Sequence, residues 1–471
     1  MNRFTPRPRL ATPSRLSSPR SWLALAALAG LLALPRPAQA FCGFFVGKTD
    51  GNLFNKSSQV AIVRDQNRTV LTMSNDYQGE LANFALVVPV PSVLQKEQIH
   101  IGDSKLLQRL DAFSAPRLVE YFDPDPCPKH QPRYRAMKNA DGPAMEMLTP
   151  APAVGKAERA QGVTVEAAYT VGEYDIVLLS ATQSGGLAEW LTDNGYKVPA
   201  RTAAAVEPYV KQEMKFFVAR VNLKEQKKAG FNELRPIQIA FESPKFMLPI
   251  RLGMANAPAG AQPGERGAQD LVVFTLTRNG RVESTNYQTA KIPSDVTVPE
   301  FVQSDFGNFY RATFAKEHQK HDHRAVVTEY FWNMGWCDPC AAQPLSTAEL
   351  RELGALWVDQ TAYHGGALPV LLTRLHVRYD EQRWPEDLAF QETGDQQNFQ
   401  ARYVLQHPFK GDVSCAAGQE YGRQLRARRG EEAKTLAALT GWELEGIRKQ
   451  MGPDPHTPQA PKAWWKTLWE K

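Results

Sequence analysis

The sequence predicts an α+β fold: a mainly antiparallel sheet or sheets with interspersed helices, two long flexible inserts and a helical C-terminal appendage. Two observations lead to this class. Segments of strand period and segments of helix period are interspersed without the regular strand–helix–strand alternation of a parallel sheet. In addition, Asn279-Gly280 stands between the strand-like segments 271–277 and 281–287. That dipeptide is the strongest hairpin signal in the chain, because both residues favour the backbone of a tight turn.

The other strand-like segments are short apolar or alternating runs bounded by turn residues. Residues 58–74 predict a hairpin that turns at 65–67, and residues 82–91 predict a buried strand that ends at its prolines. Residues 163–181 predict strand structure broken near Gly172. Further strands are expected at 216–223, 236–242, 246–252, 369–379, 388–392 and 399–405. A charged, Lys-rich loop is expected to join the 216–223 and 236–242 strands.

Helices are expected where apolar residues recur every three or four positions. One helix begins after Ser346, which forms a capping box with Glu349; Leu353, Leu356 and Trp357 would continue its apolar face. The remaining helices are expected at 105–113, 186–194, 202–213, 300–314 and from residue 430 onward.

Two stretches, 140–162 and 255–270, are rich in Ala, Pro and Gly and carry no period, so they predict flexible inserts. Residues 123–128 predict a rigid, proline-rich connector. We expect one α+β region over 41–405, with a possible division into two subdomains at either insert, followed by a basic, helical, Trp-rich tail over 406–471.

The first 40 residues predict a secretory signal. Five arginines precede the apolar run 22–34, and Ala38-Gln39-Ala40 is a small-x-small cleavage site. The run is short for a membrane span. Phe41 stands where a lipoprotein would have a small residue before Cys42. We therefore expect export to the periplasm or the cell exterior, with cleavage after Ala40 and no lipid anchor.

The charge of the chain resides largely in that signal. Removing its six arginines lowers the formal net charge from +5 to −1. The mature chain therefore has no overall electrostatic preference for nucleic acid, and nucleic acid is not an expected partner.

All five cysteines follow the cleavage site, in a compartment where disulfides form. They are Cys42, Cys127, Cys337, Cys340 and Cys415. An odd number leaves one thiol over or one pair fewer, and the sequence does not choose among the pairings. We expect at least one long-range disulfide that ties the Cys337/Cys340 corner, or the Cys42 end, to a distant segment.

Trp336-Cys337-Asp338-Pro339-Cys340 resembles the active-site tetrapeptide of thioredoxin with its preceding Trp. In such a site one thiolate is stabilised at a helix N-terminus and the second Cys resolves the mixed disulfide. The spacing argues against this use here, because no strand fits between Cys340 and Pro369 and no apolar strand is expected to lead into Trp336. We interpret the pair as structural, with thiol–disulfide exchange as the alternative.

His318, His321 and His323 form a His-x-x-His-x-His pattern. Imidazoles at this spacing can share a metal ion, so a metal-dependent hydrolase is a further alternative. The flanking charges favour a solvated helix end. No phosphate loop, dinucleotide fingerprint or nucleophile motif is present, so the sequence predicts no catalytic residue and no cofactor.

The last ten residues interleave Trp464, Trp465 and Trp469 with lysines. This composition is typical of segments that contact a membrane surface. It also suits a tail that docks on its own domain, which is the reading we favour, with peripheral membrane contact as the alternative.

Several stretches together resemble an uncharacterised bacterial family, the domain of unknown function 2330. They are Phe41-Cys42-Gly43 and residues 83–91, 175–181, 190–199, 249–253, 336–340 and 373–379. The resemblance covers about residues 41 to 391 and implies an exported bacterial protein, but it implies no activity. From all of this we expect a non-catalytic binding or assembly component of the cell envelope, stapled by disulfides, whose partner is an unknown ligand or envelope protein.

Overall fold

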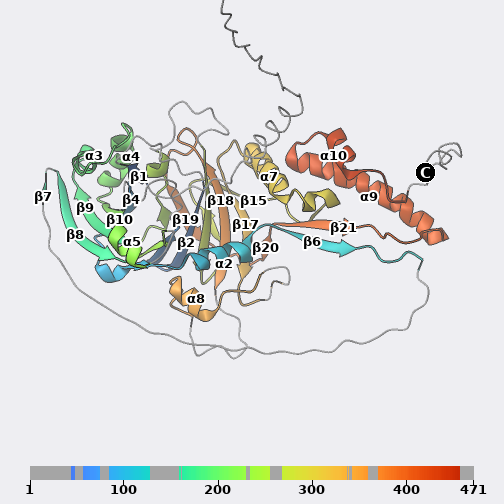
Figure 1. Cartoon of the computed structure of the whole chain (residues 1–471), viewed down its shortest axis with the longest axis horizontal. Helices are drawn as coiled ribbons and strands as arrows, with labels where there is room; N and C mark the ends of the chain where they lie inside the picture. Colours follow the sequence, from blue (N-terminus) through green and yellow to red (C-terminus); the bar gives the residue numbers. More distant parts are fainter. Residues whose placement is uncertain are drawn as a thin grey trace, which may run out of the picture. The chain divides into compact units, whose positions relative to one another are not determined.

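A computed structural model describes residues 44–47, 57–74, 84–127, 159–160, 162–229, 234–254, 268–336, 338, 342–358 and 370–456. Within these ranges the strands form four sheets, mostly antiparallel, with helices interspersed (Figure 1). The predicted α+β class is confirmed. The expected signal segment, most of both expected inserts and the Trp-rich end of the chain lie outside the described residues.

The first sheet is antiparallel throughout and has the strand order β1-β4-β10-β9-β8-β7. The break expected near Gly172 is the turn of the β8–β9 hairpin, where that glycine has a φ of +54°. The strands are β1 (Phe44–Gly47), β4 (Phe84–Val90), β7 (Arg159–Ala160), β8 (Val163–Val171), β9 (Tyr174–Ala181) and β10 (Lys215–Val221). Both α3 (Ser184–Asp193) and α4 (Thr202–Lys211) pack on one of its faces through Leu187, Leu191 and Val206.

The central sheet has the order β15-β17-β18-β13-β2-β3-β11-β5, with β20 beside β17. The pairs β15/β17 and β13/β2 are parallel, and the β2–β3 hairpin is confirmed. Its strands are β2 (Ser57–Asp65), β3 (Arg68–Met73), β5 (Ile99–Ile101), β11 (Ile237–Glu242), β13 (Gln269–Thr277), β15 (Gln288–Lys291), β17 (Ala325–Asn333), β18 (Leu371–Tyr379) and β20 (Phe399–Gln400). A short helix, η2 (Lys96–Gln98), precedes β5.

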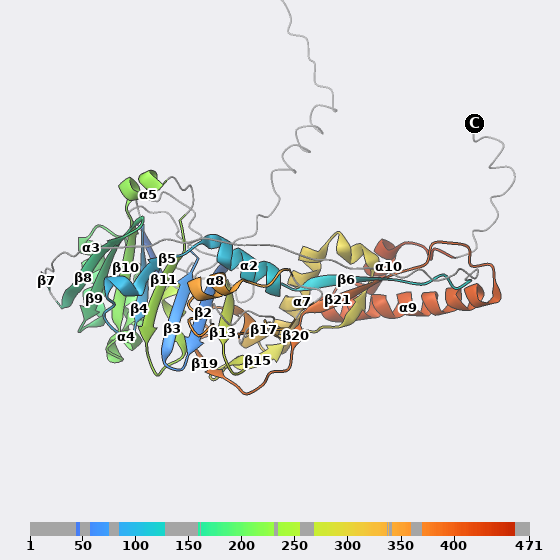
Figure 2. The same ribbon diagram turned by 90° about the horizontal axis from the view of Figure 1, so that it is seen from below.

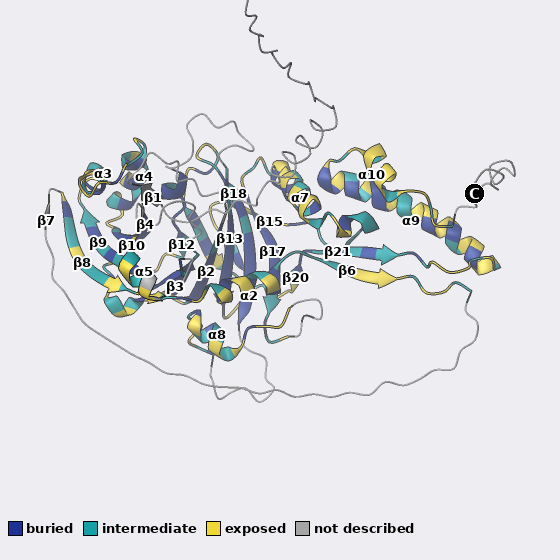
Figure 3. Ribbon diagram, viewed as in Figure 1, coloured by how far each residue is buried: buried dark blue, intermediate teal, exposed yellow. Residues whose placement is uncertain are grey.

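Both faces of the central sheet are buried (Figure 3). Along β2, Val60 and Ile62 point to the first sheet, whereas Ala61 and Val63 point to α2 (Ser104–Ser114) and α8 (Thr347–Glu352). Alternate side chains of a strand leave opposite faces, so a strand covered on both sides must be apolar throughout. Each fully buried aliphatic side chain contributes about 1.5–3 kcal/mol. Buried residues of both sheets belong to one apolar cluster, so the two sheets share one core.

The capping box predicted for α8 is confirmed, with Ser346 Oγ accepting from Glu349 N. Leu350 and Leu353 are buried, but Leu356 is one of the exposed large apolar side chains. The expected continuation of the apolar face through Leu356 is wrong, because the helix ends at Glu352 and the helical period ends with it.

The hairpin predicted at Asn279-Gly280 is wrong. β13 is already paired on both sides, with β18 and β2, so β14 (Val282–Ser284) pairs instead with β19 (Leu388–Glu392) in a small linking sheet, β12-β19-β14. A Cβ on Gly280 would lie 2.0 Å from the carbonyl oxygen of Thr393. The glycine therefore permits a close approach of two backbones rather than a two-residue hairpin turn.

Two further expectations are wrong. The Lys-rich segment after β10 contains a helix, α5 (Leu223–Ala229), where a loop was expected. The strand expected at 246–252 is only β12 (Met247–Leu248), followed by the helical turn α6 (Arg251–Met254). Here the backbone N–H groups of Ile250 and Arg251 donate to Asp387 Oδ1, at 2.9 and 3.1 Å. A carboxylate distant in sequence thus takes the place of a strand partner.

The C-terminal helices pack against a three-strand unit, β16-β21-β6, whose pairs are parallel (Figures 1 and 2). Phe309, Tyr403 and Leu436 are among the residues of the shared core. The elements are β6 (Arg117–Phe122), β16 (Val296–Val298), η3 (Glu300–Gln303), α7 (Phe306–Lys320), β21 (Arg402–His407), α9 (Ala416–Thr440) and α10 (Leu444–Met451). The helix expected from residue 430 thus begins at Ala416, with Cys415 as its N-cap.

Candidate functional site

One face of β18 carries a row of charged side chains, Arg374, His376 and Arg378. They stand two residues apart, so they leave the same face of the strand. Asp270 of the neighbouring β13 accepts from Arg378 at 2.7 and 3.0 Å and lies 3.3 Å from His376 Nε2. At the other end of the row, Arg374 Nη1 donates to Asp111 of α2 at 2.5 Å.

Glu329 of β17 completes this row. It is the extra residue of a β-bulge, because Thr328 pairs with Leu375 and Tyr330 already pairs with Arg374. A bulge re-aims a side chain, and here the carboxylate lies 2.6 Å from Arg374 Nε and 2.7 Å from His376 Nδ1. Tyr310 of α7 also donates its hydroxyl to Glu329.

The charges of the row shift its pKa values strongly. Burial by itself would raise the pKa of Glu329, but the positive charges of His376 and Arg374 outweigh it and lower the pKa to about 2. Burial opposes the imidazolium of His376, but Glu329 and Asp270 outweigh that and raise its pKa. Asp111, Glu329 and Asp270 thus face three cations, so the row is charge-balanced.

The centre of this row is buried beneath α7. The Phe314 ring stacks on His376 with centroids 3.8 Å apart, and the Glu329 side chain is 1% exposed. Glu329 and Arg374 at the centre of the row are therefore shielded from solvent, whereas Asp111 and Asp270 are partly exposed. The row acts as an ionic clamp that fixes α7 and α2 to the central sheet.

The three histidines named by the sequence lie at the end of α7 and just beyond it. His318 and His323 face each other, with their Nδ1 atoms 3.3 Å apart, whereas His321 contacts Glu317 at 3.3 Å. Burial, with His323 nearby, lowers the pKa of His318 to about 3, so this imidazole is neutral. In the described part of the chain, no group of three or more His, Cys, Asp or Glu side chains is placed to hold a metal ion.

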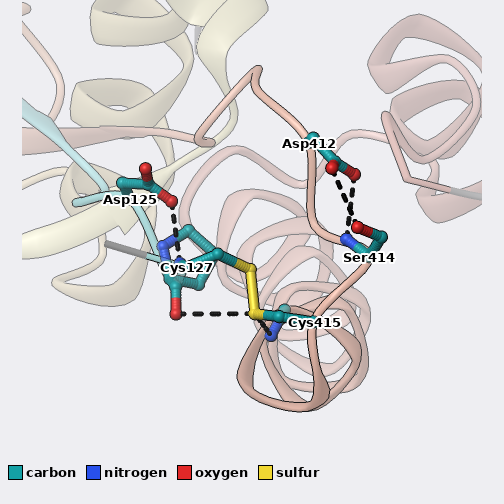
Figure 4. The surroundings of a disulfide bond; sticks show 7 residues. Asp125, Cys127, Asp412, Ser414 and Cys415 are labelled. Atoms are coloured by element: carbon teal, nitrogen blue, oxygen red, sulfur yellow. Dashed lines mark hydrogen bonds between the residues drawn. A yellow bond between two sulfur atoms is a disulfide. The ribbon is translucent and has the colours of Figure 1, made fainter. Parts of the chain in front are cut away.

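Two of the five cysteines form a disulfide, Cys127–Cys415, across 288 positions (Figure 4). It joins the segment after β6 to the N-terminus of α9, where Cys415 Sγ also accepts from Gly418 N at 3.2 Å. A long-range disulfide was expected, but at the Cys337/Cys340 corner or at Cys42. Those three cysteines, like Trp464, Trp465 and Trp469, lie outside the described residues, so their predicted roles stay predictions.

The surroundings of residues 336–340 correct one argument. No apolar strand was expected to lead into Trp336, yet β17 is buried over most of its length and ends three residues before it. Asp338, between the two cysteines, is buried and accepts from the Tyr330 hydroxyl at 3.1 Å. The adjacent polar residues Thr328 and Glu329 interrupt the apolar run of β17, which is why the sequence did not reveal this strand.

The described surface is hollowed by a cleft of about 500 Å³ where α4, α6 and the linking sheet meet. This volume is typical of sites for small molecules, which often lie where two substructures join. Its walls carry charges of both signs beside an apolar surface. They include Gln212, Lys245, Phe246, Met247, Arg251, Asn286, Glu386, Asp387 and Phe390.

Asp387 is the organising residue of this cleft. Its Oδ1 accepts from the Tyr209 hydroxyl at 2.7 Å and from the N–H groups of Ile250 and Arg251. Burial raises the pKa of Asp387 above its ordinary value, although these hydrogen bonds oppose the shift. On the opposite side, Lys245 Nζ donates to Gln212 at 2.6 Å. Phe246 and Phe390 form an apolar wall, with ring centroids 5.3 Å apart.

Sequence reasoning missed this cleft. Arg251 lies in the stretch 249–253 that carried the family resemblance, but nothing in that stretch indicated a role for it. Asp387 is separated from Arg251 by 136 positions and lies in no recognisable motif. An acidic residue directly before a predicted strand was the only available signal, and it is too common to indicate a site.

These features define a class of protein. A disulfide indicates an oxidising, extracytoplasmic compartment. No helix among the described residues has the length and apolar character required to cross a membrane. The molecule is thus an α+β protein with a polar cleft and an ionic clamp, and its disulfide points to an extracytoplasmic location.

The chain belongs to a bacterial family described as "Uncharacterized protein conserved in bacteria (DUF2330)", whose model matches residues 36–391. This confirms the family that the sequence motifs indicated. No curated protein and no solved structure matches the chain.

Proposed function

We propose that this is an exported cell-envelope protein that binds a small zwitterionic molecule in the cleft between α4, α6 and the linking sheet, without transforming it. The observation that carries this proposal is the composition of the cleft: two cations, Lys245 and Arg251, and two carboxylates, Glu386 and Asp387, around one apolar wall. Such a site can hold an anionic and a cationic group of one molecule together.

The ligand class follows from these groups. A carboxylate would pair with Lys245 and Arg251, an ammonium group with Glu386 and Asp387, and an apolar side group would cover Phe246 and Phe390. An amino acid with an aromatic or aliphatic side chain has all three parts and fits a cleft of about 500 Å³.

For the cleft, binding without catalysis is supported by the state of three buried acid and base groups. Glu329 and His376 are sealed beneath α7 and neutralise each other, so neither is free to exchange a proton with a ligand. Asp387 is held by three donors as a fixed acceptor. A fixed acceptor orients a ligand, whereas a general base must take up a proton from it.

Phenylalanine, phenethylamine and 3-phenylpropionate share one ring and differ only in charge, so they test the proposal. We expect phenylalanine to raise the melting temperature and both singly charged analogues to have little effect. Lys245→Ala should abolish the shift, whereas Lys211→Ala, an exposed lysine on α4 paired with Glu207, should preserve it. Equal shifts from all three probes, or no shift from phenylalanine, would refute the assignment.

Export has its own test. Intact mass of the protein recovered outside the cytoplasm should correspond to a chain that begins at Phe41. A mass that includes the first 40 residues, or a lipid on Cys42, would contradict cleavage after Ala40.

A second candidate function is thiol–disulfide exchange by Cys337 and Cys340. It is favoured by the buried strand that precedes Trp336 and by the buried carboxylate of Asp338 between the cysteines, which could accept a thiol proton. An insulin-reduction assay with dithiothreitol separates the two proposals. If the protein catalyses insulin reduction and Cys337→Ser abolishes that activity, thiol–disulfide exchange rather than ligand binding is its main function.

A further inference from the structure

A second cavity, of about 230 Å³, lies among the C-terminal helices and shares no lining residue with the cleft. It is bounded by η3, α9, the end of α10 and the segment that begins with β21. Phe301, Leu425 and Met451 supply apolar walls. The charged lining residues are Glu300, Glu432, Arg428 and Arg429.

Both arginines of this cavity are already paired with groups outside it. Arg428 donates from Nη1 and Nη2 to Asp123 at 2.9 and 2.7 Å. Arg429 lies 2.9 Å from Asp454 and donates to the carbonyl oxygens of Met451 and Gly452 at 2.8 Å. These partners therefore largely neutralise the positive charges of the two arginines.

Glu432 is the exception. Its side chain is 8% exposed, and its nearest described cation is Arg428 Nε at 3.4 Å. That contact is not a hydrogen bond, because Arg428 Nε is itself a buried donor without an acceptor in the described structure. A buried carboxylate normally has several donors. Among the described residues, Glu432 has none within hydrogen-bond geometry.

The remaining charged groups around Glu432 add negative charge. Glu300 of η3 lies on the same cavity, although His407 Nδ1 contacts it at 2.6 Å, and His407 is in turn shared with Glu120. Burial, together with Glu300 and Asp123, outweighs Arg428 and Arg429 and raises the pKa of Glu432 to about 7. Glu432 is therefore the carboxylate of this cavity to which no described cation donates a hydrogen bond.

We propose that this cavity is a binding site for a small organic cation with N–H donors, namely a primary ammonium group on a short apolar chain. The ammonium group donates to Glu432 and supplies the cationic donor that this carboxylate lacks. The chain packs between Phe301, Leu425 and Met451. A primary ammonium fits the site because it offers up to three donors in little volume.

Proton balance gives the site a distinctive signature. Below about neutral pH the Glu432 carboxyl holds a proton, and the cation must displace it to solvent on binding. Above that pH the carboxylate is already charged and no proton leaves. Affinity should therefore fall from about pH 8 to about pH 6, with release of up to one proton per cation bound at the lower pH.

Calorimetry with n-butylammonium, in two buffers of different ionisation enthalpy, measures affinity and proton release together. Tetramethylammonium, which lacks N–H donors, and butyrate, which has the opposite charge, are the matched probes. We expect binding of butylammonium only, with proton release at about pH 6. Absence of binding, equal binding of tetramethylammonium, or binding without proton release would overturn the proposal.

Glu432→Gln should weaken butylammonium binding roughly tenfold or more, because it removes the charge that accepts from the ammonium group. Glu431→Gln, the preceding and solvent-exposed residue on α9, is the matched control and should leave binding unchanged. Circular dichroism and melting temperature establish that both variants fold. Binding that is unchanged in folded Glu432→Gln would place the cation elsewhere and refute the site. The phenylalanine test of the cleft is independent of this result.

Discussion

Two regions of this molecule each bury a glutamate, and the two glutamates behave in opposite ways. Beneath α7, Glu329 is in contact with Arg374, His376 and the Tyr310 hydroxyl. Among the C-terminal helices, Glu432 has one poorly aligned arginine nitrogen at 3.4 Å. The pKa of the first falls to about 2, and the pKa of the second rises to about 7.

This difference shows that burial disfavours the charged form of a carboxyl group, whereas the neighbouring charges and donors decide whether its pKa falls or rises. Both carboxylates lose their water, which by itself raises a carboxyl pKa. At Glu329 the attraction of two cations outweighs the loss of hydration, so its charge stabilises the fold. No comparable partner reaches Glu432, so its charge remains available to a ligand. The first region is an ionic clamp, and the second has the character of a receptor site.

The largest expected effect comes from breaking the clamp. Glu329→Gln leaves Arg374 and His376 buried without their shared anion, so it should lower the free energy of unfolding by about 3–5 kcal/mol. Urea unfolding near neutral pH measures this. Glu242→Gln, at an exposed ion pair with Arg68 on the same sheet, is the control and should cost about 1 kcal/mol or less. A similar small loss in both variants would show that the row does not hold α7.

The next effect concerns the covalent link of the second region. Replacing Cys127 and Cys415 together by alanine should cost about 2–5 kcal/mol, because the long loop closed by the disulfide gains freedom in the unfolded chain. The Asp123–Arg428 ion pair lies in the same corner and should keep α9 folded. Thermal unfolding with and without reductant provides the comparison. If reduction leaves the melting temperature of the wild-type protein unchanged, the disulfide is not a staple.

The pH dependence of stability separates the two glutamates. The folded-state pKa of Glu432 is raised from 4.5 to about 7, so its protonated form stabilises the fold below pH 4.5 and that stability is lost as pH rises through about 7. At roughly 1.4 kcal/mol per pKa unit the loss is at most about 3.5 kcal/mol. The folded-state pKa of Glu329 is lowered to about 2, so its contribution is present above 4.5 and is lost as pH falls towards 2.

His376 also contributes to the pH dependence of stability, so the contribution of Glu432 must be measured as a difference between two proteins. Its raised pKa contributes stability that is present below 6.5 and is lost as pH rises through the folded value. Subtracting the profile of Glu432→Gln from that of the wild-type protein cancels His376 and Glu329. The remaining curve should fall between about pH 4.5 and 7, and the variant should be the more stable protein at the upper end. A flat difference curve would mean that water or a partner already compensates Glu432.

The sequence by itself determined much of the local structure. The α8 capping box, the β2–β3 hairpin, α2 with its buried leucines and the turn at Gly172 depend on residues within a few positions of one another. For the same reason Asn279-Gly280 was misleading. It marks a change of direction correctly, but which strand comes next depends on the free edges of distant sheets.

Only the tertiary structure decided the groups that give this protein its chemistry. The sequence shows Arg374, His376 and Arg378 as alternate residues of a strand, but not that a bulge would bring Glu329 between them. It shows neither that Asp387 would accept from Arg251, 136 positions away, nor that Cys127 would reach Cys415. Nor does it show that Glu432 would be buried without a donor. The charge state of a side chain depends on the solvent it loses and the charges it gains, and both are fixed only when distant segments pack together.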